Sequence, residues 1–235
     1  MKFPIGLMVL CFLMSARSEG QDVDGPMKIL GPDHFFENSE LRFYGGPEIG
    51  CNFTQVDGDA YSGYSKVGLT GGGLVYVRFS ENTGVAMELI YSQKGSKGVV
   101  NYTNPYTGLN QGFQTYRLNL NYVEVPIVLH FETGLRLHYE IGLSYGQLIS
   151  SKESVDGDPG VYIDPDTHRF IQFDLEGIAG FEYHLGGEIF FEGRFQYSLT
   201  SVRHSDQIPL GYGYGSAGQF NNLVSFILVY LFHGR

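Results

Sequence analysis

Two short polar segments carry residue types that could do covalent or acid–base chemistry. His204-Ser205-Asp206 places a base beside a hydroxyl nucleophile, the pairing that serine esterases use. Adjacent residues of an extended chain point to opposite faces, so a hydrogen bond between this histidine and serine is not expected. His168 with Asp164 and Asp166 has the acid–base residue types of a protease, but a loop this polar is ordinarily just solvated. The support for catalysis is therefore weak.

Closely spaced aspartates and glycine runs are the next candidates. Val56-Asp57-Gly58-Asp59 recurs as Val155-Asp156-Gly157-Asp158. Such carboxylates suit Ca²⁺, but an EF-hand loop needs further oxygen ligands and a distal glutamate that neither stretch provides, and Asp-Gly is also ordinary turn chemistry. The glycine runs at 69–73 and 212–215 do not open a helix, as a phosphate-binding loop would. We expect no cofactor and no metal, with divalent-cation binding by these loops as an alternative.

Composition narrows the class of protein. The chain has 235 residues, a net charge of −10, 33 glycines and 17% charged residues. An acidic chain is a poor partner for nucleic acid, because phosphate binding needs a basic surface. Two cysteines cannot form a disulfide scaffold. The charged fraction lies below the roughly 25% of an ordinary soluble domain. The elements that would position any site must therefore be unusually apolar.

The N-terminus has the pattern of an export signal. Lys2 precedes an apolar run at 5–14 that is too short to span a bilayer, and small residues follow at Ala16 and Ser18. We expect residues 1–18 to be a signal peptide cleaved after Ser18. Residues 19–40 are polar and broken by prolines, which is typical of an irregular periplasmic lead-in. The remaining domain is expected at 41–235.

From residue 41 onward, apolar and polar residues alternate with the period of a strand, and no helical period is evident. The links between these segments are alternately short and long, which is the plan of an outer-membrane barrel with tight periplasmic turns and long outer loops. The expected fold is all-β: an eight-stranded antiparallel up-and-down transmembrane β-barrel with a polar interior. The eight expected strands are 41–55, 65–79, 85–95, 114–131, 136–150, 170–184, 188–202 and 219–232.

The apolar face of each segment is expected to meet lipid, with residues such as Ile141, Leu175 and Phe191 near mid-strand. A soluble barrel would instead turn this face inward. Tyrosines near the strand ends would form the aromatic girdles at the membrane interfaces. The expected girdle residues are Tyr91, Tyr116, Tyr122, Tyr145, Tyr183, Tyr197 and Tyr230.

The opposite face would fill a narrow lumen, because about eight strands enclose only enough space for side chains. Buried carboxylates need cationic partners, so Arg78 and Arg194 are expected to bridge neighbouring glutamates in a structural network with Glu88, Glu124, Glu140 and Glu176. The full inward set is expected to be Arg42, Glu48, Tyr76, Arg78, Glu88, Ile90, Glu124, Glu140, Asp174, Glu176, Glu182, Glu192, Arg194 and Gln196.

One segment breaks the alternation. Its apolar residues are even-numbered up to Tyr122 and odd-numbered from Val123, and Pro126 follows closely. A β-bulge at Tyr122–Val123 would absorb such a change of phase, and a proline inside a closed barrel also calls for a bulge or a strand end. The sequence therefore predicts a bulge in this strand.

Three motifs resemble the PorT-like outer-membrane β-barrel family of Bacteroidetes. They are Glu88-Leu89-Ile90-Tyr91-Ser92-Gln93-Lys94-Gly95, Tyr122-Val123-Glu124-Val125-Pro126-Ile127 and the glycine-containing stretch from Glu140 to Leu148. Their order and spacing carry the resemblance, which covers about 41–235. It implies a barrel in the outer membrane. The name-giving member of the family belongs to a protein-secretion apparatus, which membership alone does not transfer to this chain.

We expect a non-enzymatic outer-membrane protein, structural or accessory to an envelope or protein-secretion complex through its loops or periplasmic turns. Its surroundings would be outer-membrane lipid and lipopolysaccharide, and its partner a protein of such a complex. The alternatives are a lipid-modifying or proteolytic barrel enzyme and a small-solute channel.

Overall fold

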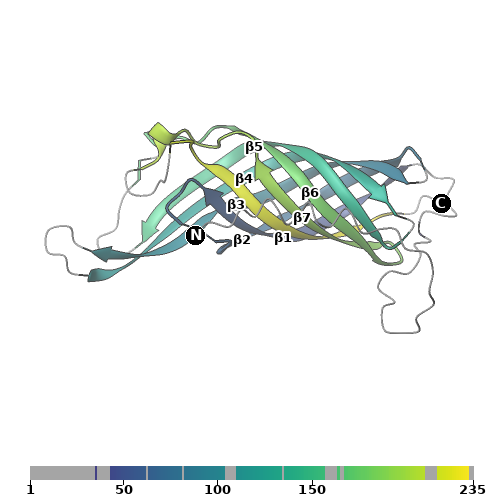
Figure 1. Cartoon of the computed structure of the whole chain (residues 1–235), viewed down its shortest axis with the longest axis horizontal. Helices are drawn as coiled ribbons and strands as arrows, with labels where there is room; N and C mark the ends of the chain where they lie inside the picture. Colours follow the sequence, from purple (N-terminus) through teal and green to yellow (C-terminus); the bar gives the residue numbers. More distant parts are fainter. Residues whose placement is uncertain are drawn as a thin grey trace, which may run out of the picture.

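A computed structural model describes residue 35 and residues 43–61, 63–80, 82–103, 110–133, 135–156, 163–164, 167–209 and 216–232. The expected signal peptide, most of the lead-in and Arg42 lie outside these residues. Eight antiparallel strands form a closed barrel, which confirms the expected fold class (Figure 1). The strands are β1 Phe43–Asp57, β2 Lys66–Arg78, β3 Thr83–Thr103, β4 Asn110–Glu132, β5 Leu137–Asp156, β6 Phe173–Gly186, β7 Ile189–Ser198 and β8 Phe220–Tyr230.

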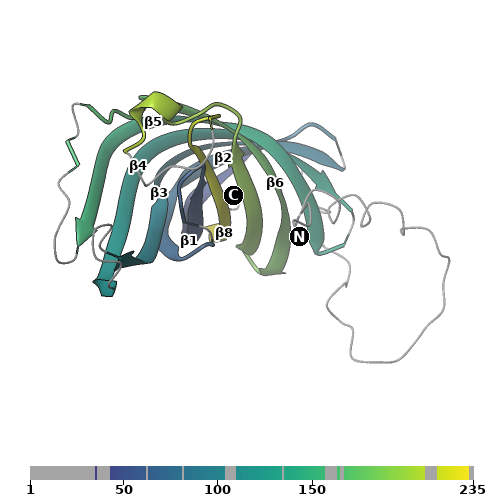
Figure 2. The same ribbon diagram turned by 60° about the vertical axis from the view of Figure 1, so that its left-hand side comes forward.

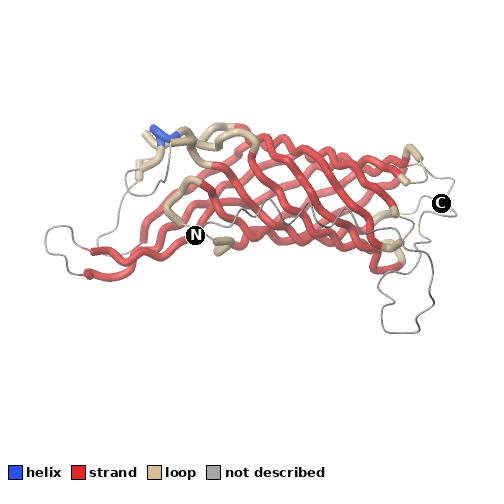
Figure 3. The backbone as a smooth tube through the Cα atoms, viewed as in Figure 1, coloured by secondary structure: helices blue, strands red, loops and turns tan. Residues whose placement is uncertain are grey.

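The barrel closes because β1 pairs with β8 as well as with β2, so the eight strands form a complete ring within the barrel wall. Each other strand pairs with its neighbours in sequence. Short links join β2 to β3, β4 to β5 and β6 to β7 at one end, and the longer links lie at the other (Figure 3). The helical element Ser205–Gln207 lies in the β7–β8 link. Among the described residues, no helix has the length and apolarity to cross a membrane.

The strands curve around a common axis (Figure 2), and their side chains alternate between a lumen face and an outer face. On β7, Arg194 is 1% exposed and faces the lumen, whereas Phe195 is 43% exposed on the outside. Ile141 on β5 is likewise outside, while Glu140 beside it is buried. Large apolar side chains thus cover the exterior and polar ones fill the interior, the arrangement of a membrane barrel rather than of a soluble one.

Two strands run well past their expected ends. The segment 96–113 has the polar composition of a loop, but Gly95 pairs with Asn119 and the ladder continues to Thr103 opposite Asn110. β5 likewise continues to Asp156, paired with Thr115. A strand needs an apolar outer face only where it crosses the bilayer, so polar residues can continue the backbone pairing without the alternation that marks a membrane strand. The result is a β3–β4–β5 extension that projects beyond the rest of the barrel (Figure 1).

The expected change of phase in β4 is not seen. Alternation continues through Tyr122 and Val123, and Tyr116, Leu118, Leu120 and Tyr122 all face inward with no exposed surface. Tyr116 and Tyr122 are therefore not girdle residues. The register shift lies in the partner strand, where Asn121 pairs with Ser150, Tyr122 pairs with Leu148, and Ile149 is the extra residue. The sequence prediction assumed that apolar residues face lipid, and here they fill the lumen.

Pro126 lies inside β4 without ending it. On the β5 side, Pro126 pairs with Ser144 and the register continues through it. Toward β3, the pairing runs from Met87 opposite Ile127 directly to Ile90 opposite Glu124, with a gap of two residues between them. Proline lacks the N–H that a ladder bond requires, so the sheet accepts it by losing pairing locally on one side.

The exterior assignment predicts a depth-dependent cost for a charge. Leu143 lies on the outer face of β5 between Ile127 and Gly177, and Leu185 lies on the same face near the β6–β7 turn. Leu143→Arg should cost about 2–4 kcal/mol and Leu185→Arg at most about 1 kcal/mol, because the penalty falls toward the interface. Denaturant titration of barrels refolded into lipid vesicles measures both. Equal costs would contradict this placement of the membrane.

Candidate functional site: the polar core of the barrel

The first of two ion-pair clusters in the lumen is built around Arg194. The guanidinium donates to both carboxylate oxygens of Glu88 at 2.7 Å and to Glu140 at 2.9 Å. Glu192 lies 2.7 Å away on the same strand. Gly180 pairs with Arg194 across β6 and β7, and a Cβ there would meet the Arg194 Cγ at 3.1 Å and a backbone oxygen at 2.6 Å. The glycine therefore leaves the space through which the arginine reaches β3 and β5.

The second cluster is built around Lys94, which is fully buried on β3. Its ammonium lies 2.6 Å from Glu124, contacts Glu176 directly, and lies 4.0 Å from Asp174. The Tyr122 ring stands 5.0 Å from the ammonium. Ser198 and Asn221 donate hydrogen bonds to Asp174 at 2.9 and 2.7 Å. Three carboxylates from β4 and β6 thus share one cation. The most distant of them, Asp174, also accepts two hydrogen bonds from neutral donors on one of its oxygens.

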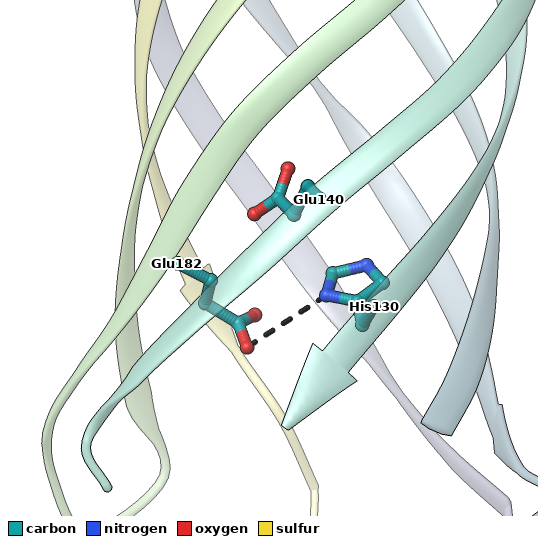
Figure 4. A group of neighbouring side chains, drawn as sticks. All are labelled: His130, Glu140 and Glu182. Atoms are coloured by element: carbon teal, nitrogen blue, oxygen red, sulfur yellow. Dashed lines mark ion pairs between the residues drawn. The ribbon is translucent and has the colours of Figure 1, made fainter. Parts of the chain in front are cut away.

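A third group lies nearer the short turns. Arg78 pairs with Glu132 at 3.0 Å, and the Tyr76 hydroxyl donates to the same carboxylate at 2.8 Å. Close by, His138 Nδ1 lies 3.0 Å from Glu182 Oε1. His130, Glu140 and Glu182 converge from β4, β5 and β6 (Figure 4). His130 and His138 are both almost fully buried.

Apolar side chains close the lumen above and below these clusters. The cap at the short-turn end includes Tyr44, Tyr76, Phe190 and Leu231, and it begins with Phe35, whose ring packs edge-on against Phe190 at 4.9 Å. The cap at the long-loop end comprises Val56, Tyr116, Leu118, Leu120, Tyr122, Leu148, Val155 and Ile163, with Tyr61 and Phe170 packed against it. In the described part of the chain, apolar clusters thus lie on both sides of the ion-pair clusters along the lumen.

The long-loop cap also holds buried polar groups. Arg203 donates to Glu153 at 2.6 Å and lies 3.5 Å from the Phe170 ring, and the Tyr116 hydroxyl donates to Glu153 at 2.5 Å. Asp59 accepts the backbone N–H of Tyr61 at 2.8 Å. Burial raises the pKa of the Asp59 carboxyl to about 6. The cap therefore contains a carboxyl group that takes up a proton at a higher pH than an ordinary aspartate does.

The sequence candidates for catalysis are not brought together. His204 and Ser205 are both exposed, and His204 makes no capping hydrogen bond to the helical turn that follows it. His168 Nδ1 donates to the Gln207 carbonyl at 3.0 Å, which leaves it poorly placed as a base. A cavity of about 360 Å³ lies beside it, lined by Lys152, Glu153, Phe170 and Arg203 among others. Its most buried cation, Arg203, is already held by Glu153.

The candidate calcium ligands are held by protein donors where they are described. Asp57 accepts hydrogen bonds from Gln55 and Asn222 at 2.9 and 3.1 Å. Asp156 is exposed and pairs with Arg117 at 3.4 Å. Asp158 and Asp166 lie outside the described residues. The one group of potential metal ligands in the described part of the chain is instead inside the lumen, at His130, Glu140 and Glu182.

The comparisons with known proteins agree with the architecture. A family model described as outer membrane protein beta-barrel domain matches residues 35–203. The chain belongs to this family. As a member of the outer membrane protein beta-barrel family, it is a protein of the outer membrane. No curated protein matches it.

Several solved barrels resemble the chain at low identity. Ail, the attachment invasion locus protein of Yersinia pestis, is 12% identical, with a TM-score of 0.40 over 82% of this chain and 100% of that one. Neisserial surface protein A is 12% identical, with a TM-score of 0.42 over 80% and 96%. The N-terminal barrel domain of Pseudomonas aeruginosa OprF is 11% identical, with a TM-score of 0.37 over 82% and 98%.

The structure places the expected network residues in three separate groups. Arg194, Glu88 and Glu140 meet in one, Glu124 and Glu176 in another, and Arg78 in a third, with Glu132. Sequence reasoning missed Lys94 as the cation of the second group. Lys94 is an even-numbered residue of the same strand as Glu88, so the alternation already placed it on the lumen face. It also missed His130, which shares the parity of Glu124 on β4 but meets Glu140 and Glu182 only through the pairing and stagger of β4, β5 and β6.

Lys94 should be essential for stability. Lys94→Met removes the cation from three buried carboxylates and should cost about 3–5 kcal/mol, because an uncompensated buried charge is expensive. Lys97→Met, at an exposed position on the same strand, should change stability by at most about 0.5 kcal/mol. Denaturant unfolding in lipid vesicles at pH 7 measures both. A Lys94→Met barrel as stable as Lys97→Met would contradict the pairing.

The long-loop cap should tighten in acid. The pKa of Asp59 is raised in the folded state from 3.8 to about 6, so its stabilising contribution is present below pH 3.8 and is lost as the pH rises through 6. Hydrogen exchange near Tyr61, corrected for intrinsic rates, should show about tenfold or more greater protection at pH 4.5 than at pH 7.5. Asp59→Asn should remove this difference. Equal pH dependence in both proteins would exclude Asp59 as its source.

Proposed function

We propose that the protein is a non-enzymatic outer-membrane barrel, structural or accessory to an envelope or secretion complex, that acts through surfaces outside the membrane. The observation that carries this is the filled lumen. Ion pairs around Arg194 and Lys94 occupy its middle, and apolar caps occupy both ends. A small-solute channel would need a hydrated path in place of these groups. With the interior committed to packing, the activity belongs to the loops and turns.

The β3–β4–β5 extension is the surface we propose as the contact. It continues the sheet beyond the barrel wall, so its backbone is held by pairing, and some of its described side chains face outward and are accessible. Val99 is 63% exposed and Ile149 is 55% exposed, and the Arg117–Asp156 pair lies on the surface. A rigid, mixed polar and apolar sheet of this kind offers a partner an ordered surface at low entropic cost. The surrounding contacts would be membrane lipid and lipopolysaccharide.

The resemblance to PorT-like barrels gains a physical basis from the core. The three motifs lie on β3, β4 and β5, and they supply Glu88 and Lys94, Glu124, and Glu140 respectively. The same motifs therefore contribute residues to both ion-pair clusters, while Arg194 on β7 and Glu176 on β6 come from outside them. This supports placement of the chain in the PorT-like branch, since the motif positions are those that the filled lumen requires.

Catalysis is not part of this proposal. The exposed His204 and Ser205 make no described hydrogen bond with each other, and His168 is engaged with a backbone carbonyl. A lipid-modifying or proteolytic activity would need a nucleophile–base pair that the described residues do not form.

The test has two arms. Purified barrel in planar bilayers should show no steady conductance at the level of a diffusion porin. A trimmed variant, in which residues 100–114 are replaced by Asn-Gly to close the hairpin after Val99, should keep the faster migration of unheated sample on SDS gels that marks a folded barrel. Site-specific photocrosslinks formed at Val99 in intact cells should disappear when the same probe is placed in this trimmed variant.

Two results would count against the proposal. Steady porin-like conductance of the wild-type barrel would overturn the filled lumen. A folded, trimmed barrel that keeps the crosslinked partner would show that the contact does not need the β3–β4 hairpin at residues 100–114 of the extension. Leu185 at the short-turn end provides the matched probe position, since crosslinks there report on a periplasmic partner instead.

A further inference from the structure

We infer that His130, Glu140 and Glu182 form a binding site for a divalent transition-metal ion of the zinc type inside the periplasmic half of the barrel. Each residue offers one ligand atom, and these atoms all lie within 4.8 Å of one another. The three side chains come from three consecutive strands and lie close together inside the barrel, with His130 and Glu182 facing one another (Figure 4). A metal there would tie β4, β5 and β6 together from within.

Cross-strand pairing places these groups. His130 is directly opposite Glu140 in the β4–β5 ladder, and His138 is directly opposite Glu182 in the β5–β6 ladder. Inward-facing residues directly opposite each other have Cβ atoms about 5 Å apart, close enough for both side chains to bind one ion. Because the ladder fixes the backbone, the ligands are preorganised without any loop.

His130 is the observation that points to a ligand. Its side chain is 2% exposed, yet neither ring nitrogen makes a hydrogen bond with any described residue. Nδ1 lies 3.8 Å from Glu182 Oε1, too far for a hydrogen bond. The ring packs edge-on against Tyr76 at 5.1 Å, which fixes its orientation. Glu140 Oε1 is also without a hydrogen bond among the described residues, while its Oε2 accepts from Arg194.

The local charge balance favours a cation. Near Arg194 the described lumen holds five buried carboxylates, which are Glu48, Glu88, Glu140, Glu182 and Glu192. Arg194 is the one permanently charged partner that the described residues offer them, because Arg78, Lys94 and Arg203 are held by other carboxylates. A divalent ion would offset much of the remaining negative charge, which is costly in a medium of low dielectric.

The ligand types select the metal. Imidazole with carboxylate suits zinc and related transition metals, whereas Ca²⁺ and Mg²⁺ prefer oxygen ligands alone. Ligand atoms about 2.0–2.2 Å from a tetrahedral ion are about 3.5 Å from one another. Side-chain movements of about 1 Å would bring the three ligand atoms to that spacing. His138 donates its hydrogen bond to Glu182 and would orient that ligand. The fourth position would be left to water.

Tag-free barrel is unfolded in denaturant, stripped with chelator and refolded into detergent with one equivalent of Co²⁺, as a spectroscopic substitute, or of Zn²⁺, so that the ion enters before the apolar caps close. We expect Co²⁺ to give the visible absorption of a four-coordinate ion, lost when excess Zn²⁺ competes during refolding, and Zn²⁺ to raise the melting temperature above that of barrel refolded with chelator. His130→Gln should weaken binding at least tenfold, and Glu182→Gln should do the same. His204→Gln, on the exposed loop, is the matched control and should bind as wild type does.

Folding of each variant is checked by its faster migration on SDS gels before heating. The inference is overturned if wild-type protein binds no Co²⁺ and gains no stability from Zn²⁺, or if His130→Gln binds as tightly as His204→Gln. If His130→Gln does not fold, Glu182→Gln and the zinc-dependent melting shift of the wild type decide the question alone. A shift in the wild type that persists in Glu182→Gln would overturn the site.

Discussion

A charged group inside an eight-stranded barrel has almost nowhere to find water. The lumen of such a barrel is only wide enough for its own side chains, so it holds little water. A carboxylate inside it is therefore stable only when a cation or a hydrogen-bond donor lies beside it. This requirement organises the whole interior. Arg194 connects β3, β5 and β7, and Lys94 connects β3 with β4 and β6. Both reach strands that are not their hydrogen-bonded neighbours, so side chains brace the barrel across its diameter.

The fold could be read from the sequence because lipid imposes a simple rule. Every membrane-embedded strand needs an apolar outer face, and the period-two pattern of β6 or β7 records that need residue by residue. The same rule misled where it does not apply. Leu118 and Leu120 are apolar because they cap the lumen, and the strand beyond Gly95 is polar because it has left the membrane. Pattern alone cannot tell an apolar cap from a lipid-facing surface.

The composition of the core was also predictable, but its partnerships were not. Alternation places Glu88, Glu124 and Glu140 inside, and scarce buried cations must then serve several of them at once. Which carboxylate meets which cation depends on strand stagger around a closed ring, a quantity that no single segment encodes. Gly180 illustrates the point, since its lack of a side chain is explained only by the arginine that crosses it from β7. His130 was missed for the same reason.

The extra residue at Ile149 separates two parts of β5 that obey different rules. Below it, even-numbered residues such as His138 and Glu140 face the lumen; above it, Val155 faces inward instead. A one-residue insertion elsewhere in a strand would turn the whole inner face outward. Here the offset is confined to the point where the strand leaves the barrel wall. The outer part of the sheet can therefore diverge in length and sequence between relatives while the inner part keeps its register. Because of the bulge, changes in the outer part of β5 need not alter which residues of its inner part face the lumen.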